Sequence, residues 1–249
     1  MARNVFTYIG AGQVYLQRLD QSTGLLPIGD VSALELAIET SEITLTQHTQ
    51  AGGGNLDKID RIDSFGLSMT LSELSKESIA MALYGDSATV AAGTVTDEQH
   101  DNIVLGALLK FENQPDASVA PTVTNTAKDV TYVAGTDYTV TSLGIIPMTA
   151  GSITADSSIL VSYTKLGVDV VQLLTNSGYE YGLVFEGLNE ANSGIAQPIE
   201  LYRIKFSPTS GLGLITEEFG SLELSGEALV DTTKTGNGVS RYGKMYIPQ

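Results

Sequence analysis

Two histidines, His48 and His100, are the only side chains of this sequence that titrate near neutral pH without help from their surroundings. A hydrolytic triad would add a nucleophile and an orienting carboxylate to one of them. The chain has no cysteine, and none of its serines stands in the Gly-x-Ser-x-Gly pattern of a nucleophile elbow. Acidic pairs for glycoside cleavage are recognised only by their separation in space. We therefore predict a non-enzymatic protein, with a hydrolase or carbohydrate-active enzyme as an alternative.

One compact cluster has the residue types of a metal site, namely Asp97, Glu98, His100 and Asp101. Hard oxygen ligands of this kind hold Ca²⁺ or Mg²⁺, but the segment lacks the spacing of an EF-hand loop. A cysteine-based zinc site is excluded by composition. We interpret the cluster as an exposed acidic turn, and we predict no metal and no other cofactor.

Two glycine-rich segments could suggest nucleotide binding. After Gly10-Ala11-Gly12, a dinucleotide fingerprint would need a third glycine where the chain has Tyr15. The run Gly52-Gly53-Gly54 is not followed by the Gly-Lys-Ser/Thr of a phosphate loop. Neither segment therefore predicts a phosphate site.

The charge balance is strongly acidic, with 13 lysines and arginines against 29 aspartates and glutamates and a net charge of −16. Nucleic-acid affinity depends on clustered cations that displace counterions from phosphate. The only local excess of positive charge comprises Lys234, Arg241 and Lys244. We expect the chain to repel DNA at long range, although the charge could serve solubility alone. No stretch reaches the roughly 20 apolar residues of a membrane span, and the N-terminus lacks the apolar block of a secretory signal.

The elements that would position any such residues are mainly strands, because apolar and polar residues alternate along much of the chain. Residues 31–40 have apolar residues at even positions, whereas residues 43–45 have them at odd positions. This phase change predicts a bulge or bend within residues 40–42. Residues 62–71 alternate again and place small and polar residues on their second face.

The segment between these two strands, residues 47–60, is long for a hairpin connection. Its three successive glycines favour a mobile loop. We interpret the segment as an arm that reaches a neighbouring subunit, and a floppy hairpin tip is the alternative. The candidate contact residues are Gln47, His48, Gly52, Gly53, Gly54, Asn55, Asp57 and Lys58.

Residues 72–84 have the spacing of an amphipathic helix, with Ser72 or Ser75 as the N-cap and Gly85 just past the end. Residues 111–166 differ from the rest, since short apolar runs there are separated by closely spaced turns. We predict an inserted small β module at 111–166, which interrupts a domain formed by residues 1–110 and 167–249. The predicted fold is mainly β, a β-sandwich or partial barrel with one α-helix.

Several segments keep a recognisable order: Val14–Asp20, Leu34–Leu36, the glycine-rich loop, the single helix, Leu201–Pro208 and Leu222–Asp231. This order resembles the major tail (tail tube) proteins of bacteriophages over most of the chain. The inserted module, with Gly135–Val140 and Val161–Tyr163, is similar to a β module that recurs in phage virion proteins. The insertion departs from the shortest members of the family.

The resemblance implies a structural virion protein whose hexameric rings stack into the phage tail tube, a conduit for DNA delivery. It implies self-association as well as contacts with the tape measure, tail terminator and distal tail proteins. DNA would cross the lumen without specific binding, no membrane would take part, and assembly would occur in the host cytoplasm.

A lumen that lets DNA pass must not bind phosphate. Glutamates that alternate with apolar core positions on the predicted strands could line it, and the candidates are Glu35, Glu39, Glu186, Glu223 and Glu227. Alternatively, these glutamates face the outer solvent. Two other structural roles share much of this reasoning: a tube protein of a contractile injection or secretion system, and a phage surface or decoration β protein.

Overall fold

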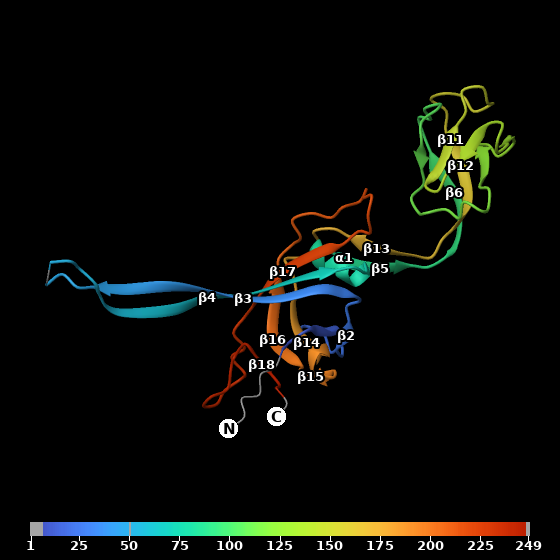
Figure 1. Ribbon diagram of the computed structural model, residues 1–249. Helices are drawn as coiled ribbons and strands as arrows, with labels where there is room; N and C mark the ends of the chain where they lie inside the picture. The colour runs from blue at the N-terminus through green and yellow to red at the C-terminus, as the bar shows by residue number, and fades with distance from the viewer. Residues whose placement is uncertain (1–6, 50, 248–249) are drawn as a thin grey trace. The chain divides into compact units, whose positions relative to one another are not determined.

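The computed structural model describes residues 7–49 and 51–247 (Figure 1). Strands dominate and the described residues contain one α-helix, so the prediction of a mainly-β fold is confirmed. The sheets are open, and none within the described residues closes into a barrel. In chain order the elements are β1 (Gly10–Arg18), β2 (Leu26–Pro27), β3 (Val31–Thr46), β4 (Asn55–Leu71), α1 (Lys76–Ala82), β5 (Asp86–Val90), β6 (Gly93–His100), β7 (Leu109–Lys110), β8 (Thr122–Asn125), β9 (Thr131–Tyr132), β10 (Tyr138–Val140), β11 (Gly144–Pro147), β12 (Ile159–Lys165), β13 (Val168–Gln172), β14 (Glu180–Asn189), the 3₁₀ turn η1 (Glu190–Asn192), β15 (Ile195–Ala196), β16 (Ile199–Phe206), β17 (Leu222–Ala228) and β18 (Gly243–Met245).

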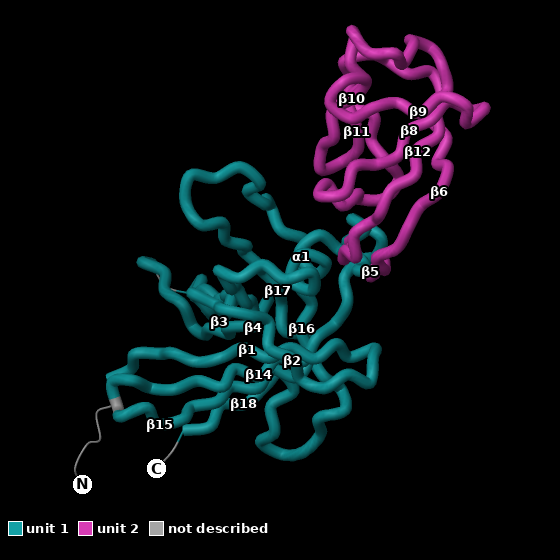
Figure 2. The backbone as a smooth tube through the Cα atoms, turned by 90° about the vertical axis from the view of Figure 1, so that its right-hand side faces the viewer, with its two compact units in different colours: residues 1–87, 171–249 teal, residues 88–170 magenta. Residues whose placement is uncertain are grey.

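The chain divides into two compact units (Figure 2). Unit 1 comprises Met1–Ser87 and Val171–Gln249, and unit 2 comprises Ala88–Val170. The inserted unit therefore begins well before the predicted boundary at residue 111. The reason is that β6 pairs with β12, while Ile103 and Phe111 belong to the same buried cluster as the later strands. The change of composition after Pro115 thus lies inside unit 2.

Unit 1 is built on a nine-stranded antiparallel sheet with the order β2-β1-β14-β16-β17-β4-β3, beside which β15 pairs with β14 and β18 with β16. Its strands alternate because one face of the sheet is buried and the other is not. The buried face and α1 share one apolar cluster: Val14, Leu16, Ile28, Leu67, Met69, Leu71, Met81, Ala82, Leu183, Leu201, Ile204, Phe206, Leu222 and Leu224. Where β17 pairs with β16, a Cβ on Gly226 would lie 2.8 Å from the carbonyl oxygen of Lys205. Glycine is therefore required for this close approach.

The β3–β4 hairpin is longer than the sequence analysis predicts. β4 begins at Asn55, so the connecting segment is residues 47–54 rather than 47–60. The charged residues after Asn55 belong to the strand, where Lys58 stands opposite Thr44 and forms an ion pair with its diagonal neighbour Glu42 at 2.8 Å. A register shift lies between Glu39 and Thr40, close to the predicted bulge, but the extra residue is Asp63 on the facing strand.

The single helix, α1, is shorter than the predicted helix over residues 72–84. Its N-cap is the second of the two predicted caps, Ser75, whose Oγ accepts a hydrogen bond from the Ser78 N–H at 3.1 Å. The Ser78 Oγ accepts one from the Ser75 N–H at 2.9 Å, which completes a capping box. The helix ends because Tyr84 takes a left-handed conformation, with φ 49°.

Unit 2 is a small antiparallel sandwich. A four-stranded sheet (β6-β12-β8-β9) and a three-stranded sheet (β10-β11-β7) contribute side chains to one cluster. Its buried members are Ile103, Phe111, Val123, Tyr138, Ile145, Ile153, Ile159, Val161 and Tyr163. The rings of Phe111 and Tyr163 stack with their centroids 4.6 Å apart. Unit 2 therefore has a hydrophobic core of its own.

One buried carboxylate, Asp137, joins three loops of unit 2. Its oxygens accept hydrogen bonds from the N–H groups of Val133 and Ser152, each at 2.7 Å, and its backbone C=O accepts one from Met148 at 2.8 Å. The side-chain bonds favour the ionised form, so they hold the pKa of Asp137 below its usual value.

We expect the stability of unit 2 to fall on acidification partly through Asp137. Because its pKa is lower in the folded than in the unfolded protein, its contribution is complete at neutral pH and is lost as pH falls below about 4, through the folded value. Asp137→Asn should remove this part of the acid dependence. Amide hydrogen exchange in unit 2 measures it, with Glu112→Gln as the control. An Asp137→Asn profile parallel to that of the wild type would contradict the assignment.

Candidate functional site

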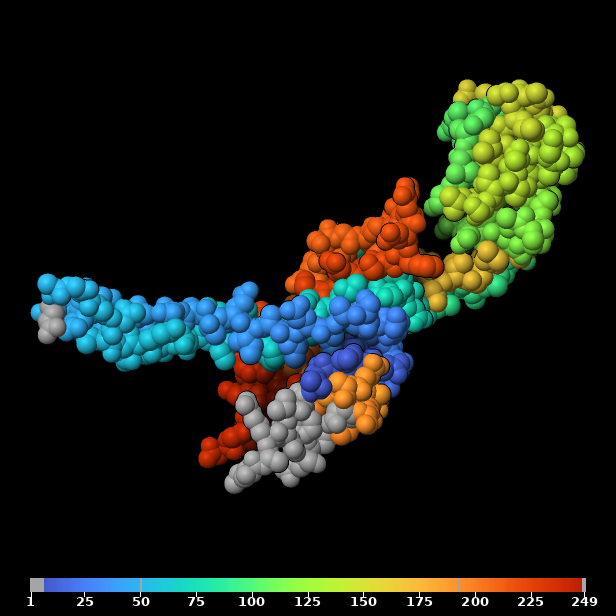
Figure 3. Space-filling model, in the orientation of Figure 1, coloured from blue at the N-terminus to red at the C-terminus, as the bar shows by residue number. Residues whose placement is uncertain are grey.

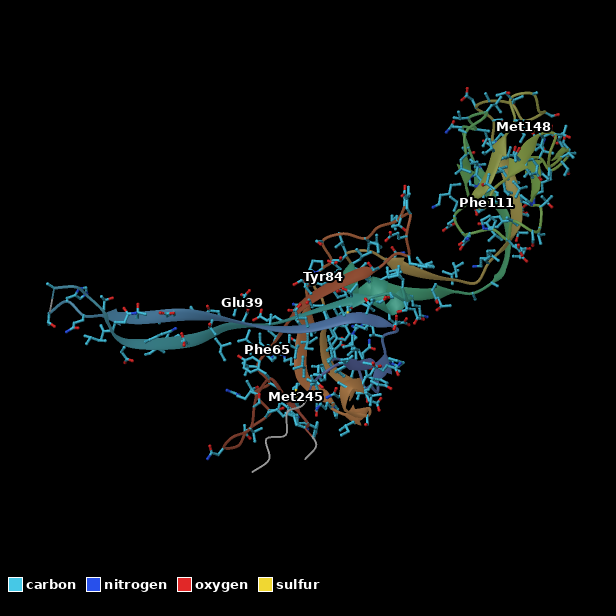
Figure 4. The ribbon with its side chains drawn as sticks, in the orientation of Figure 1. Glu39, Phe65, Tyr84, Phe111, Met148 and Met245 are labelled. Atoms are coloured by element: carbon cyan, nitrogen blue, oxygen red, sulfur yellow. The ribbon has the colours of Figure 1, made fainter. Side chains whose placement is uncertain are left out.

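The five glutamates that the sequence analysis assigns to a channel share one face of the unit 1 sheet. On β17, Glu223 lies between the buried residues Leu222 and Leu224, and so points away from the core. On β3, Glu39 is one position from Ile38, which pairs with Phe65. Figure 4 shows Glu39 and Phe65 on opposite sides of the hairpin. The cross-strand registers place all five side chains on this face: Glu35, Glu39, Glu186, Glu223 and Glu227.

This outer sheet face carries more negative than positive charge. Its strands β3, β14, β16, β17 and β18 place seven carboxylates there against three cations: Glu35, Glu39, Glu180, Glu186, Glu200, Glu223 and Glu227 against Arg203, Lys205 and Lys244. Two of the cations are neutralised by partners on the face. The Arg203 guanidinium donates two hydrogen bonds to Glu180, both at 2.7 Å, and the Lys244 Nζ lies 2.8 Å from Glu200. The face therefore has a negative field.

Two glutamates of the outer face accept hydrogen bonds from side chains of neighbouring strands. The Tyr15 hydroxyl donates to Glu186 at 3.1 Å, and this bond to the carboxylate raises the pKa of Tyr15. Arg203 lowers the pKa of Glu180 through its two hydrogen bonds. Across residues 7–49 and 51–247, no ion pair neutralises Glu223 or Glu227. A polyanion close to this face would be repelled.

Small side chains separate the carboxylates of the outer face. Ser68 on β4 lies between Glu35 and Ser225 on the neighbouring strands, and Gly66 lies between Ala37 and Glu227. A Cβ on Gly66 would meet only the Ala37 carbonyl oxygen, at 3.6 Å. Along these strands the outer face therefore carries small side chains between the glutamates, and no large side chain fills the space there.

The residues predicted to contact a neighbouring subunit lie at the far end of the β3–β4 hairpin. Gln47 and Gly54 close the tip with a backbone hydrogen bond of 2.7 Å. His48 is exposed, and Gly52, Gly53 and Gly54 all have positive φ, with no atom within 4 Å of an added Cβ. Asn55, Asp57 and Lys58 belong to β4. The glycines are thus required by backbone conformation and not by a close contact within the chain.

The outer part of the hairpin, residues 38–64, pairs only with itself, since β17 contacts β4 from Gly66 to Leu71. Within residues 38–49 and 51–64 no side chain is buried, yet six large apolar residues are exposed: Ile38, Ile43, Leu45, Leu56, Ile59 and Ile62. Ile43 and Ile59 are direct cross-strand partners. Figure 3 shows no other segment over this ribbon on the face in view. The cross-strand register places Ile43, Leu45 and Ile59 on one face of the ribbon, whereas Ile38 and Ile62 lie on the other face with Phe65. Exposed apolar side chains on both faces of an uncovered ribbon are typical of an interaction site.

The predicted acidic turn at Asp97–Asp101 is wrong, because Asp97, Glu98 and His100 lie in β6. Glu98 is mostly buried and accepts a hydrogen bond from the Tyr163 hydroxyl at 2.6 Å. Its other oxygen accepts the backbone N–H of Glu112 at 2.9 Å. Pairing with β12 brings these groups together, which local composition does not reveal. Among the described residues, no group of three or more acidic or histidine side chains could hold a metal ion.

The segment Gly10-Ala11-Gly12 is strand and not a nucleotide-binding turn. It forms the start of β1 and pairs with the end of β14, where Gly12 stands opposite Gly187. A Cβ on Gly12 would lie 2.2 Å from the carbonyl oxygen of Glu186. The glycine therefore allows close strand pairing.

Sequence reasoning does not find a cavity of about 1050 Å³ in unit 1, beside β1, β2 and α1. There Arg18 lies over the ring of Tyr179, whose hydroxyl donates to Asp86 at 2.7 Å. Arg18 is already paired with Asp20 at 2.6 Å. The pKa of Asp86 is lowered by hydrogen bonds from Thr175 and Tyr179. The charged groups are therefore satisfied by one another, and the cluster is structural.

No helix in the described part of the chain is long and apolar enough to span a membrane. A search of curated proteins gives no match. Residues 7–246 match a protein family described as "Protein of unknown function UCP028589". This match spans both units and every surface described above. The chain therefore belongs to the UCP028589 family.

Proposed function

We propose that the protein is a structural subunit that associates with copies of itself, in stacked hexameric rings that form the tail tube of a bacteriophage. The observation that carries this proposal is the outer part of the β3–β4 hairpin, which displays six large apolar side chains that no described segment buries. Exposed strands and apolar ribbons of this kind favour pairing with another chain. In a ring of identical copies that partner is the neighbouring subunit.

The acidic outer sheet face supports a conduit role. A surface that carries unpaired carboxylates such as Glu223 and Glu227 repels phosphate, so DNA can pass it without binding. The resemblance to tail tube proteins adds the tape measure, tail terminator and distal tail proteins as partners and the virion as the location. In this proposal the protein has no catalytic role.

Electron microscopy of concentrated, purified protein tests the proposal. We expect rings and hollow tubes of constant diameter, because contacts between identical subunits repeat. Analytical ultracentrifugation of the same samples should show large, concentration-dependent assemblies. A compact monomer or trimer at every concentration would contradict the tube and favour a decoration protein. Tubes that carry a contractile sheath in the native particle would favour the injection-system alternative.

A further inference from the structure

A second apolar surface of unit 1 lies in the connection between β16 and β17. Leu214, Ile215 and Phe219 are 87%, 98% and 103% exposed, the highest values among the large apolar residues of the described chain. We call the segment that contains them the Leu214–Phe219 loop. Single exposed apolar residues are ordinary on protein surfaces, but three within six positions indicate an interaction site.

The Leu214–Phe219 loop is held in place at its base. The backbone N–H of Thr209 donates to the Ala82 carbonyl at 2.8 Å, and Leu212 packs against the unit 1 core. At the tip, the Thr216 hydroxyl donates to the carbonyl of Glu218 at 2.7 Å. The loop therefore presents its apolar side chains from a fixed base, and the neighbouring Glu217 and Glu218 add two negative charges.

Unit 1 also has an apolar groove of about 300 Å³. Its main apolar lining consists of Leu36, Ile38, Ile62, Phe65, Tyr242 and Met245, and we call it the Phe65–Met245 groove. The groove forms where the inner face of the hairpin meets the segment that ends in β18, and the Phe65 and Tyr242 rings meet edge to face at 5.9 Å. An apolar cavity of about 150 Å³ accommodates a benzene ring. The groove is therefore large enough for the ring of Phe219 and an aliphatic neighbour.

The border of the groove carries two basic side chains, of which Lys244 is already paired with Glu200 at 2.8 Å. Lys244 lines it, and Arg241 stands between the lining residues Ser240 and Tyr242. Arg241 has no ion pair within the described residues. These cations belong to the only stretch of this acidic chain with a local excess of positive charge. Glu217 and Glu218 of the Leu214–Phe219 loop are complementary to the charge of Arg241, because opposite charges at an interface steer and orient association.

Within unit 1, the loop and the groove lie on opposite sides of the β3–β4 hairpin. Figure 1 shows the orange connection between β16 and β17 above the hairpin and β18 below it. Figure 4 places Phe65 and Met245 together on the β18 side. The loop of one chain therefore does not reach its own groove. Two different, complementary surfaces on opposite sides produce a head-to-tail contact, which repeats from copy to copy.

We propose that the Leu214–Phe219 loop of one copy docks into the Phe65–Met245 groove of a second copy. Phe219 and Ile215 enter the groove, while Glu217 and Glu218 face Arg241. This inference rests on the proposed self-assembly and names one contact that produces it. It is separate from the apolar outer hairpin, because the docking loop and most of the groove lie outside residues 38–64.

Thiol cross-linking tests the docking directly, because the chain has no cysteine of its own. Gly220→Cys places a thiol beside Phe219 at a position with no atom within 4 Å of the new Cβ, and Met245→Cys places one in the groove. The two variants are mixed and treated with a short bismaleimide reagent. We expect a covalent dimer from the mixture, and a ladder of multimers when both substitutions are in one chain.

Two controls make the test specific. Ala127→Cys, exposed in unit 2, replaces Met245→Cys in a parallel mixture and should give no dimer with Gly220→Cys. Adding Ile215→Ser and Phe219→Ser to the Gly220→Cys chain should reduce the dimer yield at least tenfold, because the docking side chains are lost. Equal cross-linking to Ala127→Cys, or an undiminished yield after the serine substitutions, would overturn the docking.

The outcomes separate this inference from the tube proposal. If the unmodified protein forms tubes but Gly220→Cys and Met245→Cys do not cross-link, the docking is wrong and the tube proposal stands. If the pair cross-links specifically but no tube or ring forms, the docking stands and the tube proposal falls. If neither assembly nor cross-link occurs, both are wrong.

Discussion

Ile43→Ser combined with Ile59→Ser is expected to raise the protein concentration needed for assembly by roughly 10- to 150-fold. The two residues are cross-strand partners in the outer hairpin and remain 49% and 56% exposed in the single chain. Burying a whole isoleucine side chain contributes about 1.5–3 kcal/mol, and about half of each is left to bury. The pair therefore contributes about 1.5–3 kcal/mol to a contact between copies, and each 1.4 kcal/mol is a factor of ten.

The same double substitution should leave the single chain folded, because no side chain is buried among the described residues of the outer hairpin, 38–49 and 51–64. Sedimentation over a concentration series measures the assembly, and circular dichroism with thermal unfolding measures the fold. Thr44→Ser, on the opposite face of the same strand, is the matched control and should assemble like the wild type. An unchanged assembly threshold in the isoleucine variant would remove the observation on which the proposed function depends.

Glu223→Lys combined with Glu227→Lys is expected to give assembled tubes that bind DNA, whereas wild-type tubes do not bind it. Both residues lie on the outer sheet face and have no ion pair within the described part of the chain. Each substitution changes the charge by two units, so a ring of six would change by roughly 24 units and would attract phosphate. In phage that carry the variant, DNA delivery should slow while tube assembly persists.

The ionic strength dependence of this binding is diagnostic. Contacts with phosphate release counterions, so DNA binding by the lysine variant should weaken steeply as salt is raised. Glu223→Gln with Glu227→Gln removes charge without reversing it and should bind DNA far less. Normal infectivity and no DNA retention in the lysine variant, with tubes intact, would place these glutamates away from the lumen.

Much of the strand organisation follows from the sequence, because a half-buried strand alternates with period two wherever its partners lie. This alternation predicts that Glu223 and Glu227 share a face opposite to Leu222 and Leu224, and the structure has this arrangement. The helix is also encoded locally, although two candidate serines left its first residue open and the capping box selects Ser75.

The limits of unit 2 could not be read from the sequence. Composition changes near Pro115, but the structural boundary at Ala88 depends on the pairing of β6 with β12, more than fifty residues apart. The same long-range pairing buries Glu98 beside Tyr163, where local composition favours an exposed turn. Neither arrangement has a signal in a short window of sequence.

The amino-acid sequence by itself determined the mainly-β class, the acidic charge and the side of each strand that faces the core, since these depend on composition and on the spacing of neighbouring residues. Only the tertiary structure decided which surfaces stay uncovered: the outer hairpin, the Leu214–Phe219 loop and the Phe65–Met245 groove. The local sequence around an apolar residue does not show whether a distant segment of the chain covers that residue. Its exposure is set by chain folding across long separations, and in this protein it is the exposure that indicates a partner.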